Sequence, residues 1–294
     1  MRGEGAVSDI LRFVYRHAHL NTKIVITGAT GFIGKTLCRS LENVTGYSVV
    51  PVTRKKNKPG FYFSSDYRDA PPGDVLVHLG EDSDRARVNS TGEAYRRESG
   101  EVVDSLLDCG YKIVIYCSSA VVYGDSGTKP YTEKMPVYPV DTYSQAKLEN
   151  EERVLNAGGS VIRLANVIGP GMAVNNVLSD ILAQMTAAGP VTVRNGRPIR
   201  DFVWVDDVAQ ALISLVQKQD PGIYNVGTGV GVSIQELAEM FITIAGKDQK
   251  EVHSMASSSG HSYNVVDIEK MKSTFGWSPT VTLSRSIRSL VDSI

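Results

Sequence analysis

The sequence has few cysteines, and their spacing narrows the class of protein. Among its 294 residues are three cysteines, Cys38, Cys109 and Cys117, which form neither a CxxC motif nor a Cys/His metal pattern. An odd, scattered set of this kind is typical of free thiols in a reducing compartment. We therefore expect a cytoplasmic protein without structural disulfides and without a bound metal.

The sequence also lacks an excess of charge of either sign. It contains 31 basic and 32 acidic residues, which gives a formal net charge of −1. No overall field would attract a nucleic acid or an anionic membrane, so we expect neither as a partner. Hydrophobic residues make up 42% of the chain, enough for the core of one large α/β unit or of a main domain with a smaller appendage.

The first 22 residues contain no long apolar run. The cluster from Ile10 to Val14 is interrupted by Arg12, and is too short and too charged for a signal peptide or a membrane span. We interpret residues 1–22 as an N-terminal extension, with an amphipathic helix from about Ser8 as the alternative.

From Lys23 onward, short apolar segments alternate with longer segments of helical period. This alternation predicts an α/β fold with a doubly wound parallel sheet. The predicted strands are Lys23–Thr27, Ser48–Val52, Val75–Leu79, Lys112–Ser118, Ser160–Leu164 and Tyr224–Val226. The predicted helices are Phe32–Leu41, Ser90–Cys109, Thr142–Leu155, Val177–Ala187 and Val205–Lys218. We expect residues 23–170 to bind a dinucleotide and residues 171–294 to form mainly a smaller C-terminal substrate-binding subdomain, with residues 200–228 returning to the first domain.

A glycine-rich turn follows the first predicted strand and leads into a helix. Strand, GxxGxxG turn and helix together predict a dinucleotide site, because the glycines allow a tight turn and close helix packing while the helix N-terminus offers free N–H groups to a pyrophosphate. The predicted contacts are Gly28, Thr30, Gly31, Phe32, Ile33 and Gly34.

The turn sequence TGATGFIG resembles the signature of the extended short-chain dehydrogenase/reductases, the NAD(P)-dependent epimerase/dehydratase family. Further segments carry the resemblance along almost the whole chain after residue 22. They are Asp74–Gly80, Ser118–Gly124, Tyr143–Lys147, Arg163–Pro170, Arg200–Asp207, Tyr224–Gly229 and Phe275–Pro279. The resemblance implies a Rossmann fold, a nicotinamide cofactor, a nucleotide-sugar substrate and a homodimer formed through helices 90–109 and 142–155.

The end of the second predicted strand bears on the choice of cofactor. NAD users commonly place an acid there to bind the ribose 2′-hydroxyl, whereas this chain has Arg54, which could grip a 2′-phosphate. NADP(H) is therefore preferred, with NAD(H) as the alternative. By resemblance, Asp66 and Tyr67 contact adenine, and Leu79 and Gly80 occupy the position of the family's Ala-Ala pair.

Tyr143 and Lys147 lie four residues apart in a predicted helix, so their side chains project from one face. Hydride transfer at an alcohol or ketone carbon needs a proton carrier at its oxygen. A tyrosine becomes a base near pH 7 when its phenolate is stabilised by about 4 kcal/mol, which a nearby ammonium and an oxidised nicotinamide can supply. We therefore assign Tyr143 as the acid/base, Lys147 as the cation that also binds the nicotinamide ribose, and Ser119 as a donor to the substrate oxygen.

The residues after Ser119 narrow the reaction. Sugar-nucleotide dehydratases of the family usually carry an Asp-Glu pair there, and the related epimerase-reductases usually carry a cysteine in the first position, but this chain has Ala120 and Val121. Neither can exchange a proton, which disfavours water elimination. The resemblance further implies substrate contacts at Asn166 and Arg200. Asn175 and Asn176 are candidate contacts to the substrate phosphates, but short polar residues at a helix start favour the alternative, helix capping.

These observations leave three hypotheses. The first is NADP(H)-dependent reduction of the 4-keto group of a nucleotide-activated, 6-deoxy sugar. The second is a nucleotide-sugar 4-epimerase with resident NAD. The third is a non-catalytic dinucleotide sensor, which would have no need for the set Ser119, Tyr143 and Lys147.

Overall fold

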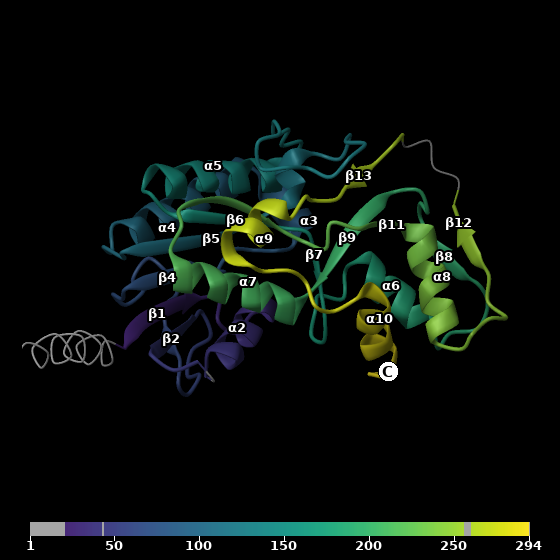
Figure 1. Ribbon diagram of the computed structural model, residues 1–294, viewed down its shortest axis with the longest axis horizontal. Helices are drawn as coiled ribbons and strands as arrows, with labels where there is room; N and C mark the ends of the chain where they lie inside the picture. Colours follow the sequence, from purple (N-terminus) through teal and green to yellow (C-terminus); the bar gives the residue numbers. More distant parts are fainter. Residues whose placement is uncertain (1–20, 43, 256–259, 294) are drawn as a thin grey trace, which may run out of the picture.

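The computed structural model describes residues 21–42, 44–255 and 260–293. Its largest feature is a seven-stranded, fully parallel sheet (Figure 1). The strand order is β10-β6-β5-β4-β1-β2-β3. The bounds are β1 (Thr22–Thr27), β2 (Tyr47–Thr53), β3 (Tyr62–Phe63), β4 (Val75–His78), β5 (Ile113–Ser119), β6 (Ser160–Leu164) and β10 (Gly222–Val226). The predicted doubly wound α/β fold is confirmed.

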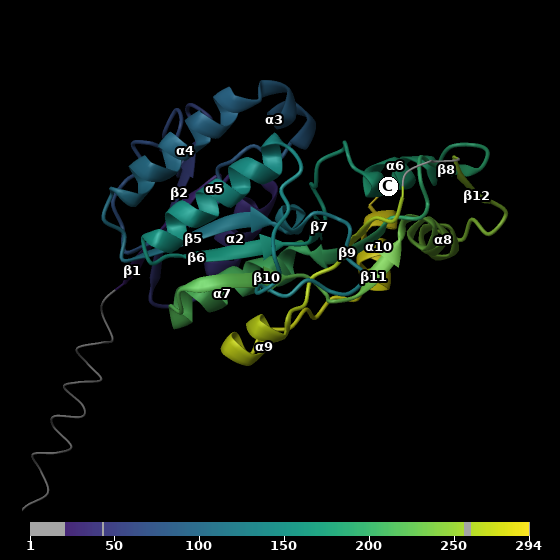
Figure 2. The same ribbon diagram turned by 90° about the horizontal axis from the view of Figure 1, so that it is seen from above.

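Helices cover both faces of this sheet, as its apolar strands require. Helices α4 (Glu93–Leu107) and α5 (Thr142–Asn156) pack together on one face, and α2 (Phe32–Glu42) packs with α7 (Val205–Lys218) on the other (Figure 2). Strands β4 and β6 are buried along their whole length, including the polar side chains of His78 in β4 and Arg163 in β6.

The predicted helix from Ser90 to Cys109 is wrong in its bounds. The structure has α3 (Arg85–Thr91) and α4 separated by Gly92, whose φ of 65° lies in the left-handed region. Asp84 caps α3 by accepting a hydrogen bond from the Arg87 amide at 3.1 Å. The helical period continues across Gly92, so the pattern alone did not reveal the break.

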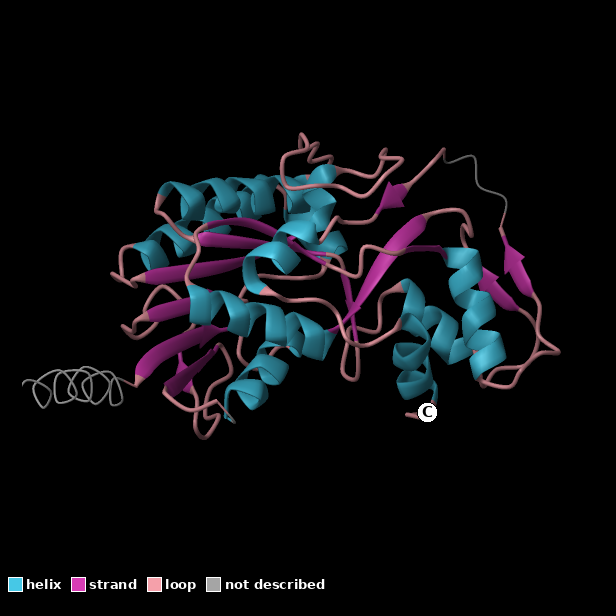
Figure 3. Cartoon of the chain, viewed as in Figure 1, coloured by secondary structure: helices cyan, strands magenta, loops and turns pink. Residues whose placement is uncertain are grey.

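A second, smaller lobe lies beyond the carboxyl ends of the main strands (Figures 1 and 3). Strand β9 pairs with β7, β11 and β13, and β8 pairs with β12. The bounds are β7 (Asn166–Ile168), β8 (Val191–Val193), β9 (Ile199–Trp204), β11 (Gly231–Ser233), β12 (Val252–Ser254), β13 (Tyr263–Asn264), α6 (Val177–Gln184), α8 (Ile234–Ile244), α9 (Glu269–Phe275) and α10 (Leu283–Val291). Helices α6, α8 and α10 share an apolar core with β9, while the chain returns to the main sheet with α7 and β10.

The expected N-terminal extension, including the alternative helix from Ser8, lies outside the described residues except for Asn21 and Thr22. None of the helices that the structure describes has the length and apolar character to span a bilayer. Within the described ranges the three cysteines are free thiols, and no cluster of acidic, histidine or cysteine side chains is arranged to hold a metal ion.

Candidate active site

The glycine turn joins β1 to α2 at the carboxyl edge of the sheet. Gly28 has a φ of 67°, and a Cβ there would lie 2.3 Å from the Leu79 carbonyl oxygen. A Cβ on Gly34 would lie 2.3 Å from the Gly28 carbonyl oxygen. Only glycine fits this approach of turn, helix and β4, so the backbone has the form that a pyrophosphate site at a helix N-terminus needs.

Thr30 fixes the turn to the end of β2. Its hydroxyl lies 3.0 Å from that of Thr53, and Phe32 begins α2 directly after the last residues of the turn. The predicted pyrophosphate contacts, Thr30 and Phe32 among them, therefore sit together at the N-terminus of one helix.

A cavity of about 310 Å³ is lined by residues at the ends of β2 and β4, by the segment after β3 and by helices α3 and α4. Arg54, Asp66, Tyr67 and Gly80 all line it, so the structure brings these predicted cofactor residues together. The Arg54 guanidinium lies over the Tyr67 ring, 5.3 Å from its centroid. A Cβ on Gly80 would lie 2.4 Å from the same ring, so glycine at this position makes room for Tyr67.

Helix α5 carries Tyr143 and Lys147. Its N-terminus is fixed by a capping box, in which Asp141 accepts from the Ser144 amide at 2.9 Å and the Ser144 hydroxyl accepts from the Asp141 amide at 3.1 Å. The Lys147 ammonium donates to the Cys117 carbonyl at 2.8 Å and lies 5.9 Å from the centre of the Tyr143 ring. The predicted pair thus shares one helix face beside the end of β5.

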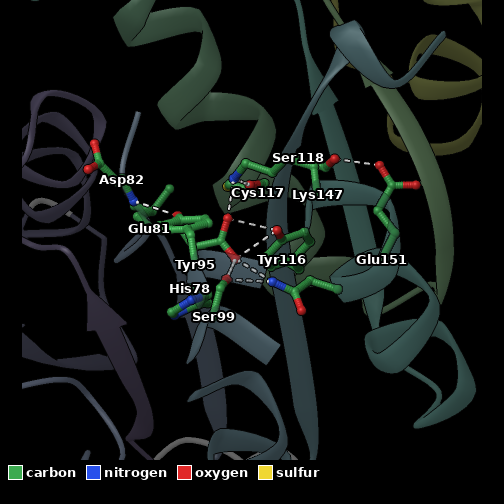
Figure 4. A network of polar contacts seen from close by, with 12 residues as sticks. His78, Glu81, Asp82, Tyr95, Ser99, Tyr116, Cys117, Ser118, Lys147 and Glu151 are labelled. Carbon is green, nitrogen blue, oxygen red and sulfur yellow. Dashed lines mark hydrogen bonds and ion pairs between the residues drawn. The ribbon is translucent and has the colours of Figure 1, made fainter. Parts of the chain in front are cut away.

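Glu81 is the site residue that the sequence analysis missed. Its side chain, 9% exposed, forms an ion pair of 2.6 Å with Lys147. It also accepts hydrogen bonds from the Tyr116 hydroxyl at 2.8 Å, the Asn150 amide at 2.7 Å and the Ser99 hydroxyl at 3.1 Å (Figure 4). The signal was present in the sequence, because an acidic residue directly follows Gly80 at the end of a buried strand.

The electrostatics of this cluster follow from burial and from the Glu81–Lys147 pair. Burial has the largest single effect and would raise the pKa of Glu81, but the Lys147 ammonium, together with the other neighbouring charges and hydrogen-bond donors, holds that pKa below its ordinary value. Burial would likewise lower the pKa of Lys147, but Glu81 raises it. The pKa of Tyr143 is raised by burial and by Glu81, against the opposing effect of Lys147.

Ser119 is the last residue of β5 and caps the following 3-10 helix, η1 (Ala120–Tyr123). Its hydroxyl accepts from the Val121 amide at 3.4 Å, a long hydrogen bond that leaves the hydroxyl able to donate elsewhere. Because η1 contacts α5, Ser119 lies at the same sheet edge as Tyr143.

The predicted substrate residues lie on the second lobe and its junction with the main sheet. Asn176 caps α6 by accepting from Leu178 and Ser179 amides at 3.0 and 3.1 Å, while Asn175 lines a cavity of about 810 Å³ beside that helix. Asn166 donates to the Asp201 carbonyl at 2.9 Å.

Arg200 does not line that cavity, and its contacts come from both parts of the fold. Its guanidinium donates to the Ser262 hydroxyl at 2.7 Å and lies 3.9 Å from the Asp125 carboxylate. Burial lowers the pKa of Arg200, yet an arginine remains a cation near neutral pH.

Comparison with known proteins identifies the family to which the chain is similar. The model of the NAD dependent epimerase/dehydratase family matches residues 24–227. Over 302 aligned residues the chain is 25% identical to a dTDP-6-deoxy-L-talose 4-dehydrogenase (NAD(P)(+)) of Kitasatospora kifunensis, covering 91% of this chain and 94% of that protein. It is 24% identical to a UDP-glucose 4-epimerase of Bacillus subtilis, covering 76% of this chain and 83% of that protein.

Solved structures agree on the fold. A UDP-glucose 4-epimerase with UDP-glucose from Thermotoga maritima matches with a TM-score of 0.81 at 24% identity, covering 92% of this chain and 97% of that one. RMD from Pseudomonas aeruginosa, complexed with NADPH, matches with a TM-score of 0.82 at 23% identity, covering 92% and 98%. The chain belongs to the NAD dependent epimerase/dehydratase family, and it is an NAD(P)-dependent enzyme of the extended short-chain dehydrogenase/reductase type.

Proposed function

We propose that the protein reduces the 4-keto group of a nucleotide-activated, 6-deoxy sugar with NADP(H). The observation that carries the proposal is the Tyr143–Lys147 pair on α5 beside the end of β5, where Ala120 and Val121, which follow Ser119, provide no further proton-exchanging side chain. Such a site supports redox chemistry at one carbon, without the acid and base that elimination of water needs. The similarity to a dTDP-6-deoxy-L-talose 4-dehydrogenase is in keeping with that substrate class.

The residues have distinct roles in this reaction. NADPH, when bound, would supply the hydride that the carbonyl carbon needs. Tyr143 donates its hydroxyl proton to the carbonyl oxygen, which gives a secondary alcohol and leaves a phenolate that solvent reprotonates. The Lys147 ammonium offers three N–H donors, and among the described residues Glu81 and Cys117 accept two of them. The third donor remains for the nicotinamide ribose. Ser119 donates to the same substrate oxygen.

Arg54 supports the choice of NADP(H). It is exposed at the rim of the 310 Å³ cavity, and its stacking on Tyr67 holds a guanidinium where a 2′-phosphate would meet it. Asp66 also lines this cavity, but it forms a 3.4 Å ion pair with Arg68. We assign adenine to the same cavity, against Tyr67 and Gly80.

The two lobes divide the work in this proposal. Residues 23–170 bind the dinucleotide, and residues 171–294 mainly bind the substrate, with α7 and β10 within residues 200–228 completing the first unit. Asn166, Asn175 and Arg200 contact the nucleotide sugar, with the cation of Arg200 serving its diphosphate. A homodimer formed through α4 and α5, and a cytoplasmic location that keeps the three thiols reduced, complete the proposal.

A nucleotide-sugar 4-epimerase is the second candidate, favoured by the similarity to UDP-glucose 4-epimerases. The same Tyr143 would then remove a proton from the 4-hydroxyl and later return it, with the cofactor regenerated in each turnover. A resident, non-exchanging cofactor has no use for an arginine such as Arg54 at the 2′-position.

Cofactor titration separates the two candidates. The wild type and Arg54→Ala are titrated with NADPH and NADH at fixed salt, following intrinsic fluorescence. Loss of a charge-assisted hydrogen bond of about 1.5 to 3 kcal/mol should weaken NADPH binding roughly tenfold to more than a hundredfold and leave NADH binding nearly unchanged. A wild type that prefers NADH, or a variant that keeps the NADPH preference, returns the epimerase to equal standing.

Product analysis tests the reaction itself. The wild type incubated with NADPH and a nucleotide-linked 4-keto-6-deoxy sugar should convert the ketone to an alcohol with one NADPH consumed per product. Tyr143→Phe, which removes one hydroxyl, should retain cofactor binding and slow turnover by about a hundredfold or more. Interconversion of 4-hydroxy sugars without net NADPH consumption would instead identify an epimerase.

A further inference from the structure

The buried carboxylate of Glu81 has no part in the reaction described above, yet it contacts that reaction's cation directly. It lies in the segment between β4 and α3, and its ion pair with Lys147 joins two side chains that are each 9% exposed. Hydrogen bonds from Tyr116 on β5, Ser99 on α4 and Asn150 on α5 fix it from three further elements (Figure 4). The carboxylate therefore has one position, with its charge against the ammonium.

We propose that Glu81 is a positioning residue that holds Lys147 and cancels much of its charge, so that Tyr143 stays protonated and the site is set for ketone reduction. The inference rests on the proposed function and deepens it by naming the favoured direction. A lysine beside a tyrosine stabilises the phenolate, which suits the oxidation of an alcohol. A lysine already paired with a carboxylate stabilises it less, which suits donation of the phenol proton to a ketone.

The charges around Tyr143 support this assignment. Lys147 faces it from α5 and Arg85 from α3, and both favour the phenolate. Glu81 and Asp82, from the segment after β4, favour the phenol, and among these four groups Lys147 and Glu81 have the largest effects. Burial has the largest effect and raises the pKa of Tyr143 above its ordinary value, while Lys147 lowers that pKa and Glu81 opposes Lys147.

Among the described residues, the other titratable groups packed against Glu81 and Lys147 are uncharged near pH 7. Glu81 is therefore the only counter-charge that they leave to the Lys147 ammonium. His78 lies against Glu81, and burial lowers its pKa to about 4, so it is neutral near pH 7. Burial raises the pKa of Tyr116 well above its ordinary value and that of Tyr95, on α4, to about 12, so both remain phenols. Without the Glu81 charge, the Lys147 ammonium would act on Tyr143 with no paired negative charge to offset it.

The proton balance gives the sign of the effect. Reduction uses the phenol and is lost as the pH rises through the pKa of Tyr143, whereas oxidation uses the phenolate and is lost as the pH falls through it. Without the Glu81 charge the phenolate is favoured. Both pH limits, the one above which reduction is lost and the one below which oxidation is lost, should therefore move to lower pH. We expect a shift of about one to two pH units, the size of one unit charge acting across a partly screened, buried site.

The test compares Glu81→Gln with two controls. Tyr116→Phe removes one hydrogen bond to Glu81 and keeps the charge, and Glu101→Gln removes a negative charge from an exposed position on α4. The kcat of ketone reduction and of alcohol oxidation is measured across pH for each variant. Both limits should shift to lower pH in Glu81→Gln, and neither should shift in Tyr116→Phe or Glu101→Gln. Unshifted limits in a folded Glu81→Gln protein overturn the proposal.

A second readout needs neither substrate nor the Glu81 variant. Ultraviolet difference titration of the wild type minus Tyr143→Phe, without added nucleotide, reports ionisation of Tyr143 alone. We expect it at or above the ordinary tyrosine value of about 10. Ionisation near pH 7 in the wild type overturns the proposal even if Glu81→Gln fails to fold. Elevated ionisation without any reductase activity would instead remove the proposed function while the charge assignment stands.

Discussion

Replacing Glu151 by Gln should lower the free energy of unfolding by about 3 to 5 kcal/mol, because it breaks a buried ion pair on one side only. Glu151 of α5 and Arg163 of β6 have side chains 1% and 4% exposed, and their charges approach to 2.6 Å. The Arg163 Nε lies 3.0 Å from Glu151 Oε2 and 3.1 Å from Oε1, and the Ser118 hydroxyl of β5 also donates to this carboxylate.

The magnitude follows from what remains after the substitution. An arginine cannot shed its proton, so the guanidinium stays charged in the interior with an amide in place of its counter-ion. Its other neighbours do not compensate: it lies 4.7 Å from the centre of the Tyr123 ring, and its Nη1 has no hydrogen-bond partner in the described part of the chain. The loss should loosen the contact of α5, the helix that carries Tyr143 and Lys147, with β5 and β6.

Urea unfolding followed by circular dichroism measures this loss, with Asp206→Asn as the matched control. The Asp206–Arg39 pair has side chains 47% and 67% exposed, so its loss should cost no more than about 1 kcal/mol. The double variant Glu151→Met/Arg163→Met should recover much of the loss, because it removes both charges together. A Glu151→Gln variant as stable as the control would refute the reasoning.

Three further predictions concern the cofactor turn and the reaction. Gly28→Ala should cost about 1 to 3 kcal/mol of stability and weaken nucleotide binding, because φ is 67° and the Leu79 oxygen blocks the Cβ. Gly60→Ala, at a φ of 78° with open space around the Cβ, is the control for backbone strain alone. Equal losses of stability in the two variants, measured by urea unfolding, contradict the steric argument. Lys147→Met should reduce both turnover, by about a hundredfold or more, and NADPH affinity by titration; unaltered affinity contradicts the ribose contact. Nucleotide sugars that retain a 6-hydroxyl should not lose water by mass spectrometry, and a dehydrated product would show that a proton carrier beyond Ala120 and Val121 serves the site.

Local patterns in the sequence were enough to predict much of the main sheet. Strand β6 and helix α7 have the predicted bounds, because one is a short, mainly apolar segment and the other an amphipathic segment, each with clear ends. The glycine turn was predictable for the same reason, since the constraint on φ at Gly28 acts within a few residues. The second lobe was not: β8, β11, β12 and β13 are two or three residues long and gain their partners from distant segments.

The same distinction between local patterns and contacts of distant segments applies to the site. By itself the sequence determined the helical spacing of Tyr143 and Lys147, the glycine turn and the absence of a proton carrier at Ala120 and Val121, because these depend on local spacing and side-chain chemistry. Only the tertiary structure decided that the Glu81 carboxylate meets the Lys147 ammonium, since 66 residues separate the two and the parallel order of β4 and β5 brings them together. The physical reason is that burial makes a charge costly unless a partner stands beside it, and that partner is chosen by the fold rather than by neighbours in the chain.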